Sequence, residues 1–258
     1  MVKVSVGIVT NRNKDPDLSY TKMVAAWLEA RNYTPVLEEE LAYSSKFLIV
    51  LGGDGTMLQA AHKAARCSTP MLGINLGNLG YLTDADRHDG LEAIEKMLAG
   101  NFTLEQRMML EVRDRLALNE ALVLREGSPK LMAFRISVDG KHMDTLRADG
   151  VIVATPTGST AYNLSAGGPI LRPDSEMIIV TAICPHTLYA RPWVFSGNHE
   201  VSITPAEEEE AVVFLDGEAK FSLNFGESIE VRRSIHTADV VKTSGMDFFE
   251  ILRRKMVQ

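Results

Sequence analysis

The chain has 258 residues, of which 45% are hydrophobic and 24% charged, as in an ordinary globular protein. Its net charge of −7 argues against a nucleic-acid partner, because a polyanion would have to bind against the overall field. The two cysteines, Cys67 and Cys184, exclude a disulfide framework and indicate a reducing compartment. No segment approaches the ~18 apolar residues of a membrane span, so we expect a cytoplasmic protein without a membrane partner.

The first hundred residues alternate between strand and helix patterns. Strands are predicted at 4–9, 47–51 and 71–74, and helices at 20–28, 56–66 and 91–98. The continuous apolar run at 47–51, FLIVL, is typical of a strand that is buried on both faces of a sheet. This part is therefore predicted to be an α/β domain with a mainly parallel sheet.

The pattern changes after residue 100 to short strands separated by turns. Strands are predicted at 103–113, 119–124, 131–138, 143–146, 151–155, 177–183, 201–203, 212–215, 221–223 and 229–231. Asp139-Gly140 is typical of a hairpin turn, where both residues need positive φ. We expect a mostly antiparallel β domain at 101–236, and a C-terminal helix at 246–256 that returns to the first domain, giving that domain residues 1–100 and 237–258.

The strongest local motif follows the buried strand and begins a helix. It is the sequence GGDGT, formed by Gly52, Gly53, Asp54, Gly55 and Thr56. Glycines let backbone N–H groups approach phosphate oxygens, and the helix N-terminus favours an anion. The carboxylate of Asp54 would accept a proton from an attacking hydroxyl, or orient that hydroxyl or a metal ion. The alternative interpretation is a tight turn capped by Asp54 and Thr56.

A second motif, TPTGSTAYNLSAGG, occupies residues 155–168 directly after a predicted strand. Its hydroxyl groups and glycines around Tyr162 suit a polar ring system, on which Tyr162 would pack while Thr160, Asn163 and Ser165 bond the ring edge. The alternative is a structural loop with a capped helix at Ser159 or Thr160. Polar residues at 119–120 and 147–150 also stand at strand ends, where ordinary turns are common.

Five segments together resemble the NAD kinase family in their order and spacing. They are GGDGT at 52–56, NE at 119–120, TPTGSTAYNLSAGGPI at 155–170, CPHTLYARP at 184–192 and LDGE at 215–218. GGDGT alone also resembles a motif of diacylglycerol and sphingosine kinases, whereas the long central run is far more specific. The resemblance implies a kinase that phosphorylates the 2′-hydroxyl of the adenosine ribose of NAD, with ATP or inorganic polyphosphate as donor.

The resemblance also implies roles for individual residues. Asp54 would be the catalytic proton acceptor, and Mg²⁺ would arrive with ATP without a dedicated protein cage. The implied ligand-binding residues are Gly52, Gly53, Gly55, Thr56, Asn119, Glu120, Lys130, Arg147, Asp149, Thr160, Ala161, Tyr162, Asn163, Leu164 and Ser165. His186 and Tyr189 lie in a segment that similar enzymes use partly for subunit contact, so we expect a homo-oligomer, a dimer or tetramer, with a shared site.

Two alternatives remain at this point. A lipid or sugar kinase would share GGDGT, although a lipid would require an apolar cleft in place of the polar run at 155–168. A non-catalytic dinucleotide-binding regulator would keep Tyr162 and its loop but would have no use for Asp54.

Overall fold

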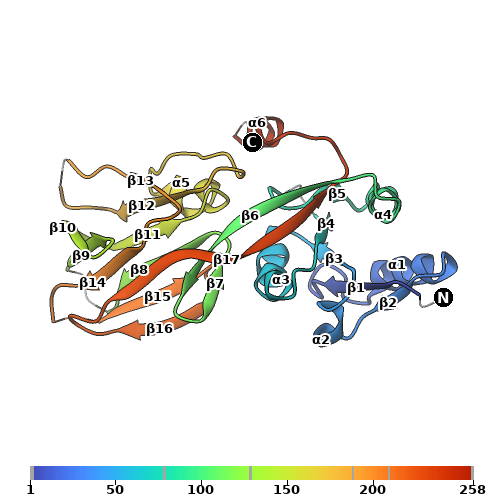
Figure 1. Cartoon of the computed structure of the whole chain (residues 1–258), viewed down its shortest axis with the longest axis horizontal. Coiled ribbons are helices and arrows are strands. Elements are labelled where there is room, and N and C mark those ends of the chain that lie inside the picture. The colour runs from blue at the N-terminus through green and yellow to red at the C-terminus, as the bar shows by residue number, and fades with distance from the viewer. Residues whose placement is uncertain (1–2, 78–79, 128–129, 188, 209, 257–258) are drawn as a thin grey trace. The chain divides into compact units, whose positions relative to one another are not determined.

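A computed structural model of the chain describes residues 3–77, 80–127, 130–187, 189–208 and 210–256. It divides into two compact units, one formed by Met1–Arg107 with His236–Gln258 and the other by Met108–Ile235. Strands β6 (Thr103–Val112) and β17 (Ile229–Lys242) each begin in one unit and end in the other (Figure 1). We call these the α/β unit and the β unit.

The α/β unit contains a parallel sheet in the order β17-β4-β3-β1-β2. Its strands are β1 (Ser5–Thr10), β2 (Thr34–Val36), β3 (Phe47–Gly52), β4 (Met71–Asn75) and the short β5 (Ala85–Asp86). Its helices are α1 (Ser19–Ala30), α2 (Glu39–Ala42), α3 (Asp54–Cys67), α4 (Gly90–Leu98) and α6 (Phe248–Met256). The end of β17 extends the sheet through Val240, which pairs with Met71 of β4.

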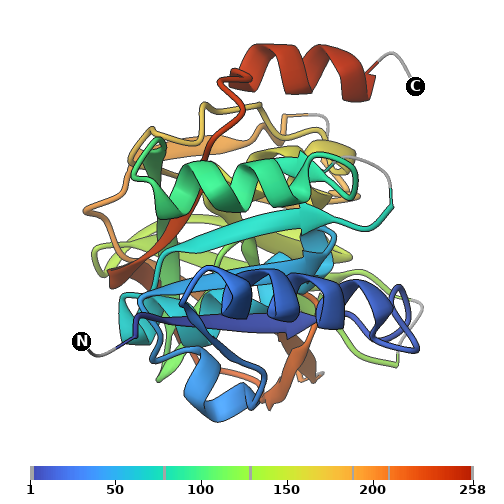
Figure 2. The same ribbon diagram turned by 90° about the vertical axis from the view of Figure 1, so that its right-hand side faces the viewer.

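Helices cover both faces of this sheet because the side chains of each strand alternate between the faces. Ile49 and Leu51 of β3 pack in one cluster with α1 and α4, which lie on the same side of the sheet (Figure 2). On the other face, α2 approaches so closely that a Cβ at Gly7 would lie 2.2 Å from the carbonyl oxygen of Ala42. β3 is thus buried from both sides, as its apolar sequence predicts.

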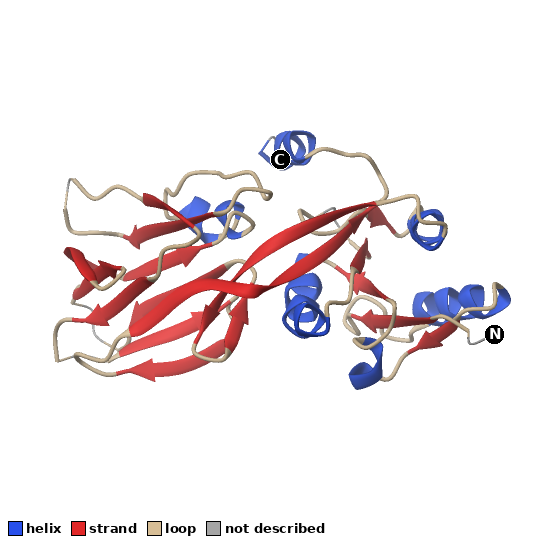
Figure 3. Ribbon diagram, in the orientation of Figure 1, coloured by secondary structure: helices blue, strands red, loops and turns tan. Residues whose placement is uncertain are grey.

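The β unit consists mainly of antiparallel strands (Figure 3). Its elements are β7 (Arg115–Ala117), β8 (Glu120–Arg125), β9 (Met132–Val138), β10 (Lys141–Ala148), β11 (Gly150–Ala154), a 3₁₀ turn (Gly158–Thr160), α5 (Tyr162–Ser165), β12 (Met177–Ile183), β13 (Trp193–Ser196), β14 (Val201–Pro205), β15 (Ala211–Leu215) and β16 (Ala219–Leu223). Among the described residues, one sheet has the order β13-β12-β11-β8-β15-β16, and β10, β9, β14 and β17 pair in another. Their apolar faces share one core around Phe134.

The predicted fold class is confirmed, including the C-terminal helix that returns to the α/β unit. Asp139 and Gly140 both have positive φ, 49° and 72°, as the predicted hairpin requires. The strand predicted at 229–231 is too short, because β17 continues through polar residues to Lys242. Strands β2, β5, β7 and β13 were missed. No helix of the described residues is long and apolar enough to cross a membrane.

Candidate active site

The carboxylate of Asp54 is held by the loop that follows β4. Oδ2 accepts the backbone N–H of Tyr81 at 2.7 Å, and Oδ1 accepts that of Leu82 at 3.0 Å. A Cβ at Gly80 would lie 1.9 Å from Oδ1, so the close approach of this loop requires glycine. Asp54 is half-buried at the first position of α3, so its charge also interacts favourably with the helix N-terminus. The carboxylate is therefore fixed in direction while it keeps lone pairs for a further partner.

The rest of GGDGT combines a tight turn with an open backbone. The hydroxyl oxygen of Thr56 accepts hydrogen bonds from Gly53 N at 3.4 Å and from Nδ2 of Asn11 at 3.1 Å. A Cβ at Gly52 would lie 2.2 Å from that hydroxyl, so the turn requires glycine there. Gly55 is exposed, and a Cβ there would meet nothing within 4 Å. Thr56 thus holds the turn, whereas the backbone at Gly55 is open to a ligand.

Lys14 lies over the glycine loop, a position that was not predicted from the sequence. A Cβ at Gly53 would lie 2.8 Å from Nζ of Lys14, and one at Gly77 would lie 3.2 Å from it. Gly53 and Gly77 follow β3 and β4, whereas Lys14 follows β1, so all three lie at the carboxyl edge of the parallel sheet. This edge is where open α/β sheets bind ligands.

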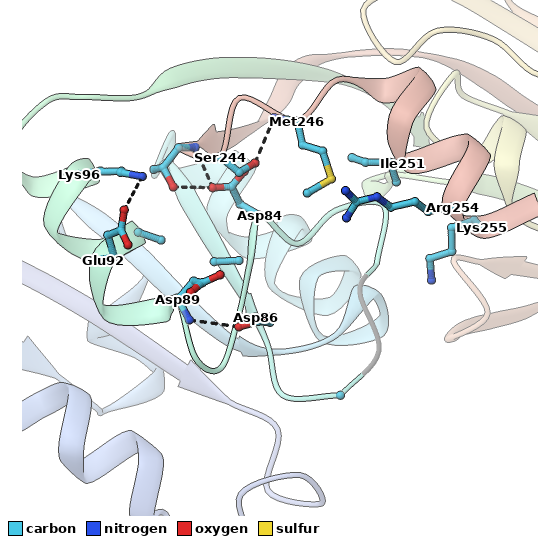
Figure 4. A pocket seen from close by; sticks show the side chains of 14 residues that line it. Asp84, Asp86, Asp89, Glu92, Lys96, Ser244, Met246, Ile251, Arg254 and Lys255 are labelled. Carbon is cyan, nitrogen blue, oxygen red and sulfur yellow. Dashed lines mark hydrogen bonds and ion pairs between the residues drawn. The ribbon is translucent and has the colours of Figure 1, made fainter. Parts of the chain in front are cut away.

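A cavity of about 760 Å³ lies beside the loop after β4 (Figure 4). Its lining includes the carboxylates of Asp84, Asp86, Asp89 and Glu92, together with Lys96 and the cationic side chains of Arg254 and Lys255 on α6. Asp84 is already engaged, because it accepts hydrogen bonds from the backbone and hydroxyl of Thr243, both at 2.7 Å, and from Ser244 at 2.9 Å. This cavity was not predicted from the sequence.

The same loop is anchored to the end of β17. Nζ of Lys242 donates to the carbonyl oxygen of Thr83 at 3.3 Å, and the backbone N–H of Gly80 donates to the Thr83 hydroxyl at 3.1 Å. Burial lowers the pKa of the Lys242 ammonium, which nevertheless keeps this carbonyl partner. Together with the hydrogen bonds that Asp84 accepts, these contacts fix the loop whose backbone N–H groups, at Tyr81 and Leu82, donate to Asp54.

In the β unit, the structure brings three of the predicted motifs together. Ala154 pairs with Glu120 and Leu215 pairs with Ala121, so the segments 119–120, 155–158 and 216 meet at one edge of the sheet. The carboxylate of Asp216 accepts the backbone N–H groups of Leu118, Asn119 and Glu120 at 2.7 to 3.1 Å. Asp216 has a φ of 48° and is therefore one of the few non-glycine residues described in the left-handed region.

Glu120 has an unsatisfied acceptor at this edge. Its side chain is buried, and Oε2 has no hydrogen-bond partner among the residues that the structure describes. Burial, followed by the negative charge of Asp216, raises the pKa of the Glu120 carboxyl to about 7. Since buried polar atoms are nearly always paired, the orphaned oxygen indicates a position for a ligand donor.

The loop after β11 is held close to Asn119. Thr155 N donates to the carbonyl oxygen of Asn119 at 2.8 Å, and the Thr155 hydroxyl donates to the carbonyl of Leu118 at 2.6 Å. A Cβ at Gly158 would lie 2.1 Å from the Asn119 carbonyl, so glycine is required for this approach. The predicted motifs at 119–120 and 155–168 are thus one structural assembly.

Asn163 has a different use from the one expected. It is fully buried, and its Nδ2 donates to the carbonyl oxygens of Ser159 and Pro169, both at 3.1 Å, while Oδ1 accepts from Thr181 Oγ1 at 2.7 Å. The expectation that this amide bonds the edge of a ring is therefore corrected: the side chain is consumed in holding the loop. Tyr162 is 41% exposed, as a side chain available to a ring system would be.

The remaining predicted residues are spread over the β unit. Thr160 and Leu164 are half-buried, Ser165 is exposed, and Ala161 precedes α5. Asp149 accepts a hydrogen bond from Nε of Arg125 at 2.8 Å, and Arg147 pairs with Glu207. Lys130 and His186 are exposed, and Tyr189 is 89% exposed. Arg147 and Asp149 thus each form an ion pair in this structure, and their expected contacts with the dinucleotide stay predictions.

Together these features define a class of protein. A fixed carboxylate beside an open glycine loop at a parallel-sheet edge is the arrangement of a phosphotransferase, because phosphoryl transfer depends on positioning and charge neutralisation. The β unit adds a polar assembly with an exposed tyrosine and an unsatisfied acceptor.

Comparisons with known proteins identify the family. The family described as ATP-NAD kinase N-terminal domain matches residues 43–102, and that described as ATP-NAD kinase C-terminal domain matches residues 118–243. The NAD kinase of Caldanaerobacter subterraneus subsp. tengcongensis is 39% identical over 98% of this chain and 99% of its own length. That of Geotalea daltonii is 35% identical over 89% of this chain and 90% of its own length. The chain belongs to the NAD kinase family.

Two solved structures share the fold. The crystal structure of an NAD kinase from Archaeoglobus fulgidus in complex with ATP has a TM-score of 0.80 and 30% identity, covering 94% of each chain. The yeast NADH kinase complexed with NADH has a TM-score of 0.83 and 25% identity, covering 99% of this chain and 88% of its own. The predicted family and its kinase activity are confirmed. The alternatives of a lipid or sugar kinase and of a non-catalytic regulator gain no support.

Proposed function

We propose that the protein transfers the terminal phosphoryl group of ATP to the 2′-hydroxyl of the adenosine ribose of NAD, giving NADP and ADP. The observation that carries this proposal is the Asp54 carboxylate, held by two backbone N–H groups beside an open glycine loop. The relatives named NAD kinase, and the relative whose structure contains ATP, support the choice of substrates.

In the proposed reaction, the 2′-oxygen forms a bond to the terminal phosphorus as the bond from that phosphorus to the bridging oxygen breaks. ADP leaves with the electron pair, and the hydroxyl proton passes to Asp54. The N–H donors of Tyr81 and Leu82 hold the carboxylate in one direction, so its remaining lone pairs orient the hydroxyl. The open backbone at Gly55 would donate to phosphate oxygens.

We propose that Mg²⁺ arrives with the triphosphate. Among the described residues, no group of three or more His, Cys, Asp or Glu side chains is placed to hold a metal ion. Asp54 and the phosphate oxygens are oxygen ligands of the kind that Mg²⁺ prefers, so they would hold it. Bound there, the ion would neutralise phosphate charge.

We propose that the assembly in the β unit binds the dinucleotide. The unsatisfied Oε2 of Glu120 suits an N–H or O–H donor of the ligand, and the exposed ring of Tyr162 suits packing against a base. The yeast relative bound to NADH supports a dinucleotide as the ligand. Asn119 would contribute through its half-buried amide.

Two further proposals concern the assembly state and the compartment. Tyr189 is the most exposed aromatic side chain described, so the segment 184–192 supports a homo-oligomer, a dimer or tetramer, whose subunits share a site. Light scattering of the wild type and Tyr189→Asp tests this, because a monomeric wild type would contradict it.

Both thiols, Cys67 and Cys184, are free and exposed, which supports a cytoplasmic, reducing location.

The function is tested by incubating purified protein with NAD, ATP and Mg²⁺ and measuring NADP with an NADP-specific dehydrogenase. Wild type is expected to give NADP in proportion to ADP. ADP without NADP would contradict NAD as the acceptor, and neither product would contradict the proposed reaction.

A further inference from the structure

We propose that Lys14 binds the phosphoanhydride chain of the phosphoryl donor. The inference rests on the proposed function and adds to it a residue outside the ranges that match the family, 43–102 and 118–243. Its basis is the position of the Lys14 ammonium over the backbone of two glycines, Gly53 and Gly77.

The Lys14 side chain lies over two glycine-containing loops at the carboxyl edge of the parallel sheet. Gly53 is the N-cap of α3 and directly precedes Asp54, and Gly77 belongs to the loop that follows the adjacent strand β4. A Cβ at either glycine would come within 2.8 Å and 3.2 Å of Nζ, respectively, so the ammonium lies over both loops. A phosphate that reaches the backbone of GGDGT would meet this charge.

Hydrogen bonds hold the segment that carries Lys14 against the glycine loop. Asn11 ties it to the glycine loop, because its backbone N–H donates to Leu51 O at 2.8 Å and its Nδ2 donates to Thr56 Oγ1 at 3.1 Å. Lys14 N in turn donates to Asn11 O at 3.0 Å. The backbone of Lys14 is therefore attached to the motif itself.

Asp15 holds the other end of this segment. Its buried carboxylate accepts hydrogen bonds from the backbone and hydroxyl of Thr21, at 2.9 and 2.6 Å, and from Tyr20 N at 3.2 Å. Although burial opposes it, these hydrogen bonds lower the pKa of Asp15, so the residue stays ionised and continues to accept them. The loop between β1 and α1 is thus ordered without a ligand, which reduces the entropy lost when Lys14 binds one.

Within the described part of the chain, Lys14 forms no ion pair with a carboxylate, whereas the exposed Lys63 and the half-buried Lys96 pair with Glu40 and Glu92, respectively. An unneutralised ammonium beside backbone N–H donors favours an anion. The net charge of −7 makes such a local cation more important for binding a triphosphate.

An ammonium recognises phosphate oxygens and not the base, so the same contact serves ATP and inorganic polyphosphate. ATP and inorganic polyphosphate both present a chain of phosphoanhydrides to the protein. Tripolyphosphate has the phosphates of ATP without the nucleoside, so its binding distinguishes a polyphosphate donor from a nucleotide donor.

The test compares wild type with Lys14→Met, Lys14→Arg and a control, Lys141→Met, whose lysine is exposed on β10 in the other unit. KM is measured for ATP and NAD, and Kd for ATP and tripolyphosphate by calorimetry without NAD. Lys14→Met is expected to raise KM and Kd for ATP roughly tenfold or more, with KM for NAD changed less than about twofold. Lys14→Arg should recover most of the loss, and the control should match wild type.

Each outcome decides the inference. If Lys14→Met loses affinity for tripolyphosphate and ATP equally, Lys14 contacts the phosphate chain of both donors. If the wild type binds ATP but not tripolyphosphate, the nucleotide is the donor whose phosphates Lys14 binds. Unchanged donor binding in Lys14→Met, or a loss confined to NAD, would overturn the inference. A wild type that makes no NADP would contradict the proposed function, and the calorimetry would still decide the role of Lys14.

Discussion

The backbone N–H of Tyr81 donates to Oδ2 of Asp54 at 2.7 Å, although the two residues are 27 positions apart in the chain. The bond joins the loop after β4 to the first turn of α3, and Leu82 adds a second bond to the same carboxylate. The reactive group of the proposed mechanism is thus oriented by a loop that is itself anchored through Thr83 to Lys242.

Gly80→Ala should lower turnover without weakening NAD binding. The added Cβ would lie 1.9 Å from Oδ1 of Asp54, so the carboxylate or the loop must move away from its present position. We expect kcat to fall at least about tenfold, because misplacement of a reacting group by ~1 Å has effects up to ~10²-fold. Steady-state kinetics check this prediction. A wild-type kcat would show that the contact between Gly80 and Asp54 does not position the reaction.

Glu120→Gln should flatten the dependence of stability on pH. The folded-state pKa of Glu120 is about 7, against an ordinary 4.5, so the folded protein binds the proton more tightly than the unfolded chain. The wild type should therefore lose stability as the pH rises from about 4.5 to about 7, by up to ~3 kcal/mol, and Gln removes this loss.

Urea unfolding at several pH values measures this effect. Asp216→Asn serves as a second probe, because removing the charge of Asp216 should bring the pKa of Glu120 closer to its ordinary value. Equal slopes in wild type and Glu120→Gln across this range would contradict the assigned pKa shift.

Asn163→Ala should destabilise the protein and raise the KM for NAD. The substitution removes three hydrogen bonds from a fully buried amide and leaves Thr181 Oγ1 and two carbonyl oxygens without this partner. We expect a loss of ~2–4 kcal/mol in the free energy of unfolding. Ser165→Ala, on the same loop but exposed, should change it by less than ~0.5 kcal/mol. Chemical denaturation of both variants checks the difference, and equal effects would refute a structural role for Asn163.

Tyr162→Ala should raise the KM for NAD while leaving kcat and the KM for ATP close to wild type. The ring is 41% exposed and packs as part of the loop surface that we assign to the base. A several-fold rise is expected, since an aromatic contact with a base contributes ~1–3 kcal/mol. Unaltered NAD binding in calorimetry would remove Tyr162 from the binding site.

The sequence contained the elements and motifs, whereas the contacts between them depend on tertiary structure. The apolar run before Gly52 was sufficient to predict a buried strand followed by a helix, although the helix begins at Asp54 and not at Thr56. The run around Tyr162 was sufficient to predict a polar loop after a strand, although Thr155, Ser159 and Asn163 of that loop are fully buried. Lys14 was missed because nothing in its local sequence distinguishes it from a surface lysine. The only signal was its position after the first strand of a parallel sheet, whose carboxyl edge it shares with GGDGT.

Asn163 illustrates the opposite error. A polar side chain in a loop rich in hydroxyls resembles a ligand contact, yet Thr181, which consumes its amide oxygen, is on a strand further along the chain. The length of β17 was missed because polar residues such as Arg232, Ser234 and His236 interrupt its middle, so the strand lacks a continuous apolar pattern.

The central claim is that Asp54 accepts the proton of the attacking hydroxyl. The direct test is the single-turnover rate of NADP formation in Asp54→Asn against wild type at saturating NAD and ATP, with NAD affinity measured by calorimetry on both proteins. The account predicts NAD affinity close to wild type and a rate lower by about 10²-fold or more. A variant that binds NAD normally and forms NADP at the wild-type rate would contradict it.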